Sequence, residues 1–189
     1  MPQPRLTPAE YLELERAAEF RHEYYNGRMY AMSGGSLPHA LIIANFSREL
    51  GNELKKTPCR VMNSDLRVAV SPNGLYTYPD IVVVCESPKY FEGQPDTLLN
   101  PVVLVEVLSP STETQDRGFK AIQYRTIPAL QEYLLVSQSE PRVEIFRRRA
   151  AHEWTFIDVA EADAFVELAS VNCRVAMPEI YDKVDFEAA

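Results

Sequence analysis

The pattern of apolar and polar positions near the N-terminus predicts two helices separated by a hairpin. The segment Thr7-Pro8-Ala9-Glu10 has the form of a capping box and predicts a first helix that ends near Glu19. Apolar residues three and four positions apart predict a second helix over 37–56, which Thr57-Pro58 ends. Between the helices, Asn26-Gly27 predicts a two-residue turn that joins strands over 21–25 and 28–32.

From residue 59 the pattern changes to short runs rich in β-branched and aromatic residues, which are typical of strands. The predicted strands are 59–63, 66–70, 76–85, 102–108, 132–136 and 143–146. Ser71-Pro72-Asn73-Gly74 predicts a turn, and a helix over about 113–125 precedes Pro128. The rest of the chain predicts edge strands over 154–159 and 165–168, and a short helix from Pro178.

These elements predict an α/β or α+β fold in which helices flank one mixed β-sheet. The chain has 189 residues, which favours a single domain over 1–189. No linker or internal repeat divides it, and we expect the core to span about 6–146, with the C-terminal strands and short helix over 150–189.

Net charge and cysteine content narrow the range of functions. With 19 basic and 27 acidic residues, the net charge of −8 argues against a nonspecific nucleic-acid coat or a binder of anionic membranes. No signal peptide or membrane-spanning run is recognisable. Cys59, Cys85 and Cys173 lie far apart, so we expect three small buried hydrophobic side chains, no disulfide, no zinc site and a cytoplasmic location.

Two carboxylates lie within or directly before apolar runs that predict buried strands. Glu106 lies inside the apolar run 102–108, which is typical of a strand buried on both faces, and an unpaired charge there would cost several kcal/mol. Asp80 opens the apolar run 81–84, directly after Pro79. Neighbouring strands lie about 4.8 Å apart, so two carboxylates on one face repel each other unless a cation lies between them. The pair therefore suggests a site for Mg²⁺.

Structural alternatives remain open at this point. Glu106 could form an ion pair or lie near an exposed strand end, and Asp80 could cap the start of its strand. The helix over 113–125 carries Asp116, Lys120 and Tyr124 at four-residue intervals, on one stripe. That stripe can face the carboxylate pair, or Asp116 and Lys120 can form an exposed surface pair.

Together these segments resemble a known family. Pro79-Asp80 followed by Glu106-Val107-Leu108 resembles the PD-(D/E)xK signature of restriction-endonuclease-like phosphodiesterases. More closely, the ordered segments are similar to those of the Uma2 family of proposed endonucleases. The segments are EYYNGR at 23–28, YPDIVVV at 78–84, VVLVEVLSPST at 102–112, the helix with Lys120, and QEYLLV at 131–136. His39 also matches, and the resemblance extends from about 6 to 146.

The resemblance implies a restriction-endonuclease-like fold with a metal site. Asp80 and Glu106 would hold Mg²⁺ or Mn²⁺, the backbone carbonyl of Val107 would complete the shell, and Glu23 would lie at its rim. Leu108 stands where the superfamily has a lysine, and Lys120 is the expected substitute.

Several further residues have open roles. His39 shares a helical face with Ile43, which favours a packed core histidine over a catalytic one. Tyr124 could orient Lys120 or a water, or simply pack, while Gln123 and Asp116 could support the ligands. The basic cluster Arg147-Arg148-Arg149 could contact phosphate, although such runs are usually solvated.

The leading hypothesis is a metal-dependent endonuclease that cleaves DNA, with Asp80, Glu106 and Lys120 as catalytic residues. DNA would bind weakly without divalent cations, and a homodimer is the expected assembly. The alternatives are a catalytically degenerate scaffold or binding module with this fold, and an ordinary α/β domain in which Asp80 and Glu106 form salt bridges.

Overall fold

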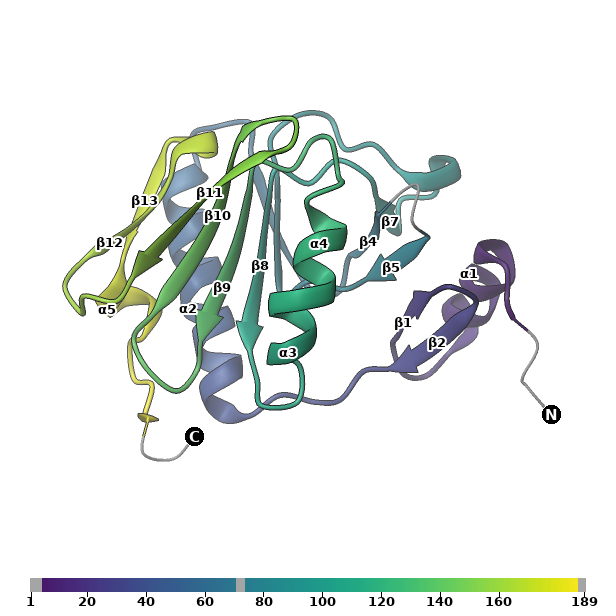
Figure 1. Cartoon of the computed structure of the whole chain (residues 1–189), viewed down its shortest axis with the longest axis horizontal. Helices are drawn as coiled ribbons and strands as arrows, with labels where there is room; N and C mark the ends of the chain where they lie inside the picture. Colours follow the sequence, from purple (N-terminus) through teal and green to yellow (C-terminus); the bar gives the residue numbers. More distant parts are fainter. Residues whose placement is uncertain (1–4, 71–73, 187–189) are drawn as a thin grey trace.

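The computed structural model describes residues 5–70 and 74–186, which form two mixed sheets and a small hairpin with helices around them (Figure 1). The helices are α1 (Pro8–Ala17), α2 (Leu37–Leu54), α3 (Glu113–Gln115), α4 (Ala121–Tyr124) and α5 (Met177–Ile180), with a π-helical segment η2 (Asp116–Lys120) and the 3₁₀ turns η1 (Phe91–Gly93) and η3 (Ala169–Val171). Among the described residues, no helix is long and apolar enough to cross a bilayer.

The larger sheet has six strands in the order β11-β10-β9-β8-β6-β3. Their bounds are β3 (Arg60–Asn63), β6 (Ile81–Val84), β8 (Val103–Leu108), β9 (Glu132–Ser137), β10 (Val143–Ala150) and β11 (Glu153–Val159). Only β8 and β9 run parallel, because the helical segment from α3 to α4 connects them; the other neighbours are antiparallel.

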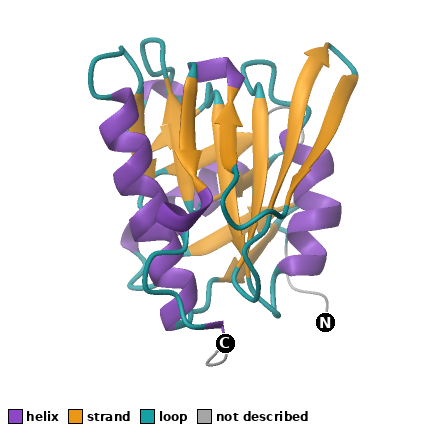
Figure 2. Cartoon of the chain, turned by 90° about the vertical axis from the view of Figure 1, so that its left-hand side faces the viewer, coloured by secondary structure: helices purple, strands orange, loops and turns teal. Residues whose placement is uncertain are grey.

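Helices cover both faces of this sheet (Figure 2). Along β8, Val103, Val105 and Val107 point to the face covered by α2 and the C-terminal elements. Leu104 and Leu108 point to the opposite face, where α4 packs. Because side chains alternate along a strand, Glu106 shares the α4 face with these two leucines.

The second sheet has five strands in the order β2-β1-β5-β4-β7. Its strands are β1 (His22–Tyr25), β2 (Arg28–Ala31), β4 (Arg67–Val70), β5 (Leu75–Thr77) and β7 (Thr97–Leu98). The predicted Asn26-Gly27 hairpin is confirmed, since both residues adopt positive φ. The capping box at α1 is confirmed as well, although the helix ends at Ala17.

The prediction of a single sheet with one strand over 76–85 is wrong. Pro79 interrupts that strand, so β5 joins the five-stranded sheet and β6 joins the six-stranded sheet. Asp80 therefore lies at the passage from one sheet to the other. The predicted turn at Ser71-Pro72-Asn73-Gly74 lies, except for Gly74, outside the described residues.

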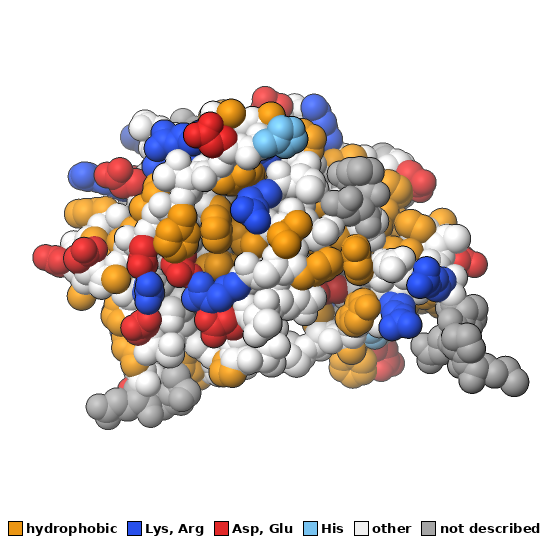
Figure 3. All heavy atoms as spheres, in the orientation of Figure 1, with side chains coloured by type: hydrophobic (Ala, Val, Ile, Leu, Met, Phe, Trp, Pro, Cys, Tyr) orange, Lys and Arg blue, Asp and Glu red, His pale blue; other side chains and the backbone are white. Residues whose placement is uncertain are grey.

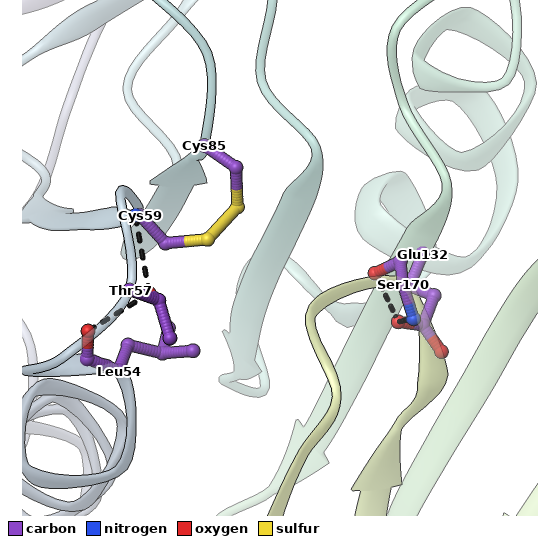
Figure 4. Close-up of a disulfide and its surroundings, with 6 residues drawn as sticks. All are labelled: Leu54, Thr57, Cys59, Cys85, Glu132 and Ser170. Atoms are coloured by element: carbon purple, nitrogen blue, oxygen red, sulfur yellow. Dashed lines mark hydrogen bonds between the residues drawn. A yellow bond between two sulfur atoms is a disulfide. The ribbon is translucent and has the colours of Figure 1, made fainter.

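The C-terminal strands β12 (Phe165–Leu168) and β13 (Cys173–Ala176) form a separate hairpin that packs with α5 against α2. The fully buried Glu132 at the start of β9 attaches this unit to the larger sheet (Figure 4). Its carboxylate accepts hydrogen bonds from the backbone amide and hydroxyl of Ser170, at 3.1 and 2.5 Å.

The prediction that all three cysteines are unpaired is wrong. Cys59 and Cys85 form a disulfide (Figure 4). They are 26 residues apart in sequence. However, β3 and β6 pair so that Arg60 faces Val84, which places the two flanking cysteines opposite each other. Cys173 is buried and free as predicted, and burial raises the pKa of its thiol to about 11. The cysteines therefore no longer argue for a reducing compartment.

Candidate functional site

A cavity of about 330 Å³ opens where β8 ends and the helical segment begins. Its walls come from the end of β2, the 33–35 loop, the Asp80 passage and the residues that follow β8. The predicted site residues that line it are Glu23, His39, Asp80, Glu106, Val107, Asp116 and Lys120. Tyr124 joins them by a hydrogen bond to Glu106. Residues separated by almost one hundred positions thus meet at one site.

Asp80 directly precedes β6, and Glu106 lies on the adjacent antiparallel strand β8. Ile81 faces Val105 in the β6–β8 register, so Asp80 comes opposite Glu106 one position further along. The backbone amide of Val107 donates to Oδ2 of Asp80 at 2.7 Å, which holds that carboxylate against the end of β8. Strand register therefore brings these two residues to the same end of β8, where both line the cavity.

Lys120 points into the site, where three carboxylates contact its ammonium. Nζ lies 2.9 Å from Oε1 of Glu23, 3.2 Å from Oε1 of Glu106 and 3.2 Å from Oδ1 of Asp116. Lys120 and Asp116 are both buried, so the exposed surface pair considered above is not formed. One positive charge therefore faces three carboxylates, with Asp80 in the same cavity.

A ring of hydrogen bonds, ion pairs and one short hydroxyl–hydroxyl contact positions these side chains. The Tyr124 hydroxyl donates to Oε1 of Glu106 at 2.7 Å and lies 3.1 Å from Oγ1 of Thr77. Thr77 in turn donates to Oε1 of Glu23 at 2.5 Å. Lys120 completes the ring between Glu23 and Glu106, so each member has little freedom to move.

Burial dominates the electrostatics of the site. Desolvation raises the pKa of Glu106 well above its usual range, and the charges of Asp116 and Asp80 raise it further, while Lys120 opposes them. The pKa of Asp116 is raised for the same reason, again against the opposing charge of Lys120. Desolvation lowers the pKa of Lys120, but Glu106 and the other two carboxylates outweigh it and keep the ammonium charged.

His39 is not part of the hydrophobic core, contrary to the interpretation favoured from its helical spacing. The inward face of α2 is formed by Ile42, Phe46 and Leu50, whereas His39 is half-buried at the cavity wall. Its Nε2 lies 3.4 Å from Oδ2 of Asp80. Burial lowers the pKa of His39, but the hydrogen bond and charge of Asp80 raise it overall.

The helix that carries Asp116 and Lys120 has a π-helical turn at this point. The amide of Ala121 bonds to the carbonyl of Asp116, five residues back, and the Tyr133 hydroxyl donates to the same carbonyl at 3.1 Å. Such turns often occur at functional sites. Here the turn includes both Asp116 and Lys120, which the predicted plain α-helix did not anticipate.

The donor set fits a hard divalent cation that keeps part of its water shell. Mg²⁺ needs only one or two protein carboxylates, and Asp80 and Glu106 supply two beside the Val107 backbone. Oδ1 of Asp116 is buried and, among the described residues, accepts no hydrogen bond despite its ion pair with Lys120. Within 5–70 and 74–186, no three Asp, Glu, His or Cys side chains converge as a complete metal-binding group.

Other predicted residues lie elsewhere. Arg147 binds Oε1 of Glu132 at 2.7 Å. Arg148 donates to backbone carbonyls, including that of Leu130 at 2.6 Å, and stacks over Trp154. Gln123 and Leu108 do not line the cavity, although Gln123 is on the same helical segment. The arginine cluster is therefore largely engaged in holding strands and loops together.

Sequence reasoning missed Thr77, which is fully buried and links Tyr124 to Glu23. Thr77 directly precedes Tyr78-Pro79-Asp80 in the sequence, and this position was the only signal that could have pointed to it. It also missed Gly35, where an added Cβ would lie 2.6 Å from Nδ1 of His39. Glycine at this position lets the 33–35 loop pass close to the imidazole.

This arrangement of sheets and helices occurs in a solved structure. The chain matches, over 93% of its length and 97% of that chain, the crystal structure of a "putative nuclease belonging to DUF820" from Anabaena variabilis ATCC 29413. The TM-score is 0.74 at 23% sequence identity. The mixed α/β fold expected from the sequence is thereby confirmed.

Sequence comparisons identify the family. Residues 8–176 match the Uma2 family, described as "Putative restriction endonuclease". Two Synechocystis proteins are similar over most of their length. The uncharacterized protein slr1290 is 37% identical over 98% of this chain and 96% of its own, and the uncharacterized protein sll1609 is 34% identical over 87% and 93%. The chain belongs to the Uma2 family.

Proposed function

We propose that this protein is a divalent-metal-dependent nuclease that hydrolyses phosphodiester bonds of DNA. The observation that carries this proposal is the charge imbalance at the cavity. Four carboxylates, from Glu23, Asp80, Glu106 and Asp116, share it with one lysine and a histidine. Such a surplus of buried negative charge is costly unless cations offset it. Mg²⁺ or Mn²⁺ bound by Asp80 and Glu106 would do so.

The residues divide into distinct roles. A bound divalent cation would supply charge neutralisation and activation of a water molecule. Asp80 and Glu106 would hold the cation, with the backbone carbonyl of Val107 beside them. Lys120, kept charged by its three carboxylates, would stabilise negative charge that develops on the phosphate. Tyr124 and Thr77 would hold Glu106 and Glu23 in place.

The test is cleavage of supercoiled plasmid and single-stranded DNA in Mg²⁺, in Mn²⁺ and in chelator. Asp80→Asn and Glu106→Gln should each lower the rate by at least about 100-fold, while their folded state is kept, as checked by circular dichroism. Glu153→Gln, at an exposed position of β11, is the matched control and should cleave normally. Wild-type rates in either site variant would disprove the mechanism.

A binding or scaffold protein is the second candidate. It is favoured by the net charge of −8 and by the absence, among the described residues, of a complete three-ligand metal group. In that case the melting temperature would still rise with Mg²⁺, because the carboxylates still gain a counter-ion, but no DNA would be cleaved. A homodimer is the assembly we propose, and analytical ultracentrifugation tests that expectation.

A further inference from the structure

A second cavity continues from the candidate site past Asp80. It has a volume of about 700 Å³ and shares six lining residues with the first cavity, namely Met32, Ser33, Gly34, Gly35, His39 and Asp80. The two cavities therefore adjoin, and we call them together the groove; the proposed metal ligand Asp80 lies at their boundary. A polymeric substrate that places its reacting phosphate at Asp80 has room to extend to both sides.

An exposed aromatic ring lines each half of this groove. Tyr30 on β2 lines the first cavity and is 47% exposed, and Phe20, in the bend between α1 and β1, lines the second and is 72% exposed. Neither ring belongs to an aromatic pair among the described residues. The amide of Met32 donates to the carbonyl of Arg21 at 3.0 Å, which fixes the bend beside the end of β2.

Positive charge in the groove is scarce. Lys120 and Arg21 are the only lysine and arginine that line its described walls. Lys120 is held by three carboxylates, and Arg21 is paired with Asp65 and donates to the Ser64 carbonyl. The face drawn in Figure 3 likewise intersperses acidic and basic side chains and shows no broad basic area. Nonspecific duplex binding depends on cation–phosphate contacts, so this groove is poorly equipped for it.

We propose that Phe20 and Tyr30 are stacking platforms for unpaired bases on either side of the reacting phosphate, so that the substrate is single-stranded or locally unpaired DNA. This inference rests on the proposed nuclease function. An aromatic side chain stacks on any unpaired base, whereas the bases of an intact duplex have both faces already covered. Stacking also supplies affinity without cations, which matches the acidic walls of the groove.

The experiment measures binding separately from cleavage. Fluorescence anisotropy follows a fluorescein-labelled 20-nucleotide single strand, and the same sequence as a duplex, in Ca²⁺ at several salt concentrations. We expect the wild-type protein to bind the single strand at least tenfold more tightly than the duplex. Phe20→Ala and Tyr30→Ala should each weaken single-strand binding by roughly 5- to 150-fold, the range for loss of one stacked base. The dependence of affinity on salt should change little, because no cation is removed.

Conservative and control variants separate stacking from a structural effect. Phe20→Trp and Tyr30→Phe keep a flat ring and should restore binding. Phe156→Ala removes a 52% exposed aromatic side chain from β11, outside the groove, and should bind normally. Equal affinity for single strand and duplex, or alanine variants that bind as the wild type does, would overturn the inference.

Cleavage in Mg²⁺ distinguishes this failure from failure of the proposed function. If cleavage of DNA requires Asp80 and Glu106 but is unchanged in the Phe20 and Tyr30 variants, the stacking proposal is disproved and the proposed nuclease function is supported. If the single strand binds through the rings but is never cleaved in Mg²⁺ or Mn²⁺, the platforms stand and the nuclease is disproved.

Discussion

Glu106 and Glu132 are buried on the adjacent parallel strands β8 and β9, yet their surroundings differ. Glu132 faces Arg147, whose Nε lies 2.7 Å from Oε1. Its carboxylate also accepts three hydrogen bonds from Ala169 and Ser170. One negative charge thus meets one positive charge and a nearly full set of donors.

Glu106 has fewer hydrogen-bond donors than Glu132, and it shares its only lysine with other carboxylates. Lys120 and Tyr124 both contact its Oε1, at 3.2 and 2.7 Å. The same lysine is shared with Glu23 and Asp116. The comparison teaches that burial of a glutamate does not by itself mark a functional site. What marks the site is negative charge in excess of the donors and cations that the fold provides.

Removal of the Glu132 carboxylate should have the largest effect on stability. Glu132→Ala leaves Arg147 without its buried partner and releases the 169–170 turn, so we expect a loss of about 3–5 kcal/mol in the free energy of unfolding. Urea denaturation measures the loss, which should be the same in Mg²⁺ and in chelator. If Mg²⁺ restored the stability of Glu132→Ala, Glu132 would not be the purely structural glutamate that the comparison with Glu106 makes it.

Lys120→Met should come next. It removes the one lysine from the carboxylate cluster, and we expect a loss of about 3 kcal/mol in chelator because several buried carboxylates then lack a counter-ion. A divalent cation should recover a large part of that stability, as measured by the melting temperature during a Mg²⁺ titration. Absence of any recovery would contradict the proposal that the cavity holds a cation.

Glu106→Gln should stabilise the protein in chelator, by about 1 kcal/mol near neutral pH, since one of the crowded carboxylates is gone. The gain should depend on pH. Burial raises the pKa of Glu106 in the folded state, so the native protein binds this proton more tightly than the unfolded chain does. The wild-type protein therefore loses stability as pH rises through the raised pKa, and the variant does not. The free energies of unfolding of the variant and the wild-type protein should therefore converge at low pH. A stability gain that is the same at every pH would contradict this account.

Tyr124→Phe should have the smallest effect. It removes one hydroxyl from the ring that joins Glu106 to Thr77, and we expect a loss of about 0.5 kcal/mol. Tyr25→Phe is the control, because among the described residues the Tyr25 hydroxyl makes no hydrogen bond and its ring packs against Phe119. If the two variants unfold at the same urea concentration, the ring contributes nothing to stability.

Local sequence signals predicted many of the elements correctly. The capping box at Thr7, the Asn26-Gly27 turn and the apolar periodicity of the second helix each act over a few residues, so the sequence alone specifies them. Glu106 could be singled out for a similar reason, because a charge inside a seven-residue apolar segment violates a rule that needs no knowledge of the fold.

The tertiary structure decided what each of these residues contacts. Pro79 was visible in the sequence, but only the pairing of β5 and β6 with different partners shows that the chain passes there from one sheet to another. The Cys59–Cys85 disulfide depends on the β3–β6 register, and His39 faces Asp80 although its helical spacing indicated the core. Likewise, Thr77 gains its role only where β5, the hairpin and α4 meet. The physical reason is the same in each case: local propensities act along the chain, whereas strand register and charge compensation join residues that are far apart in it.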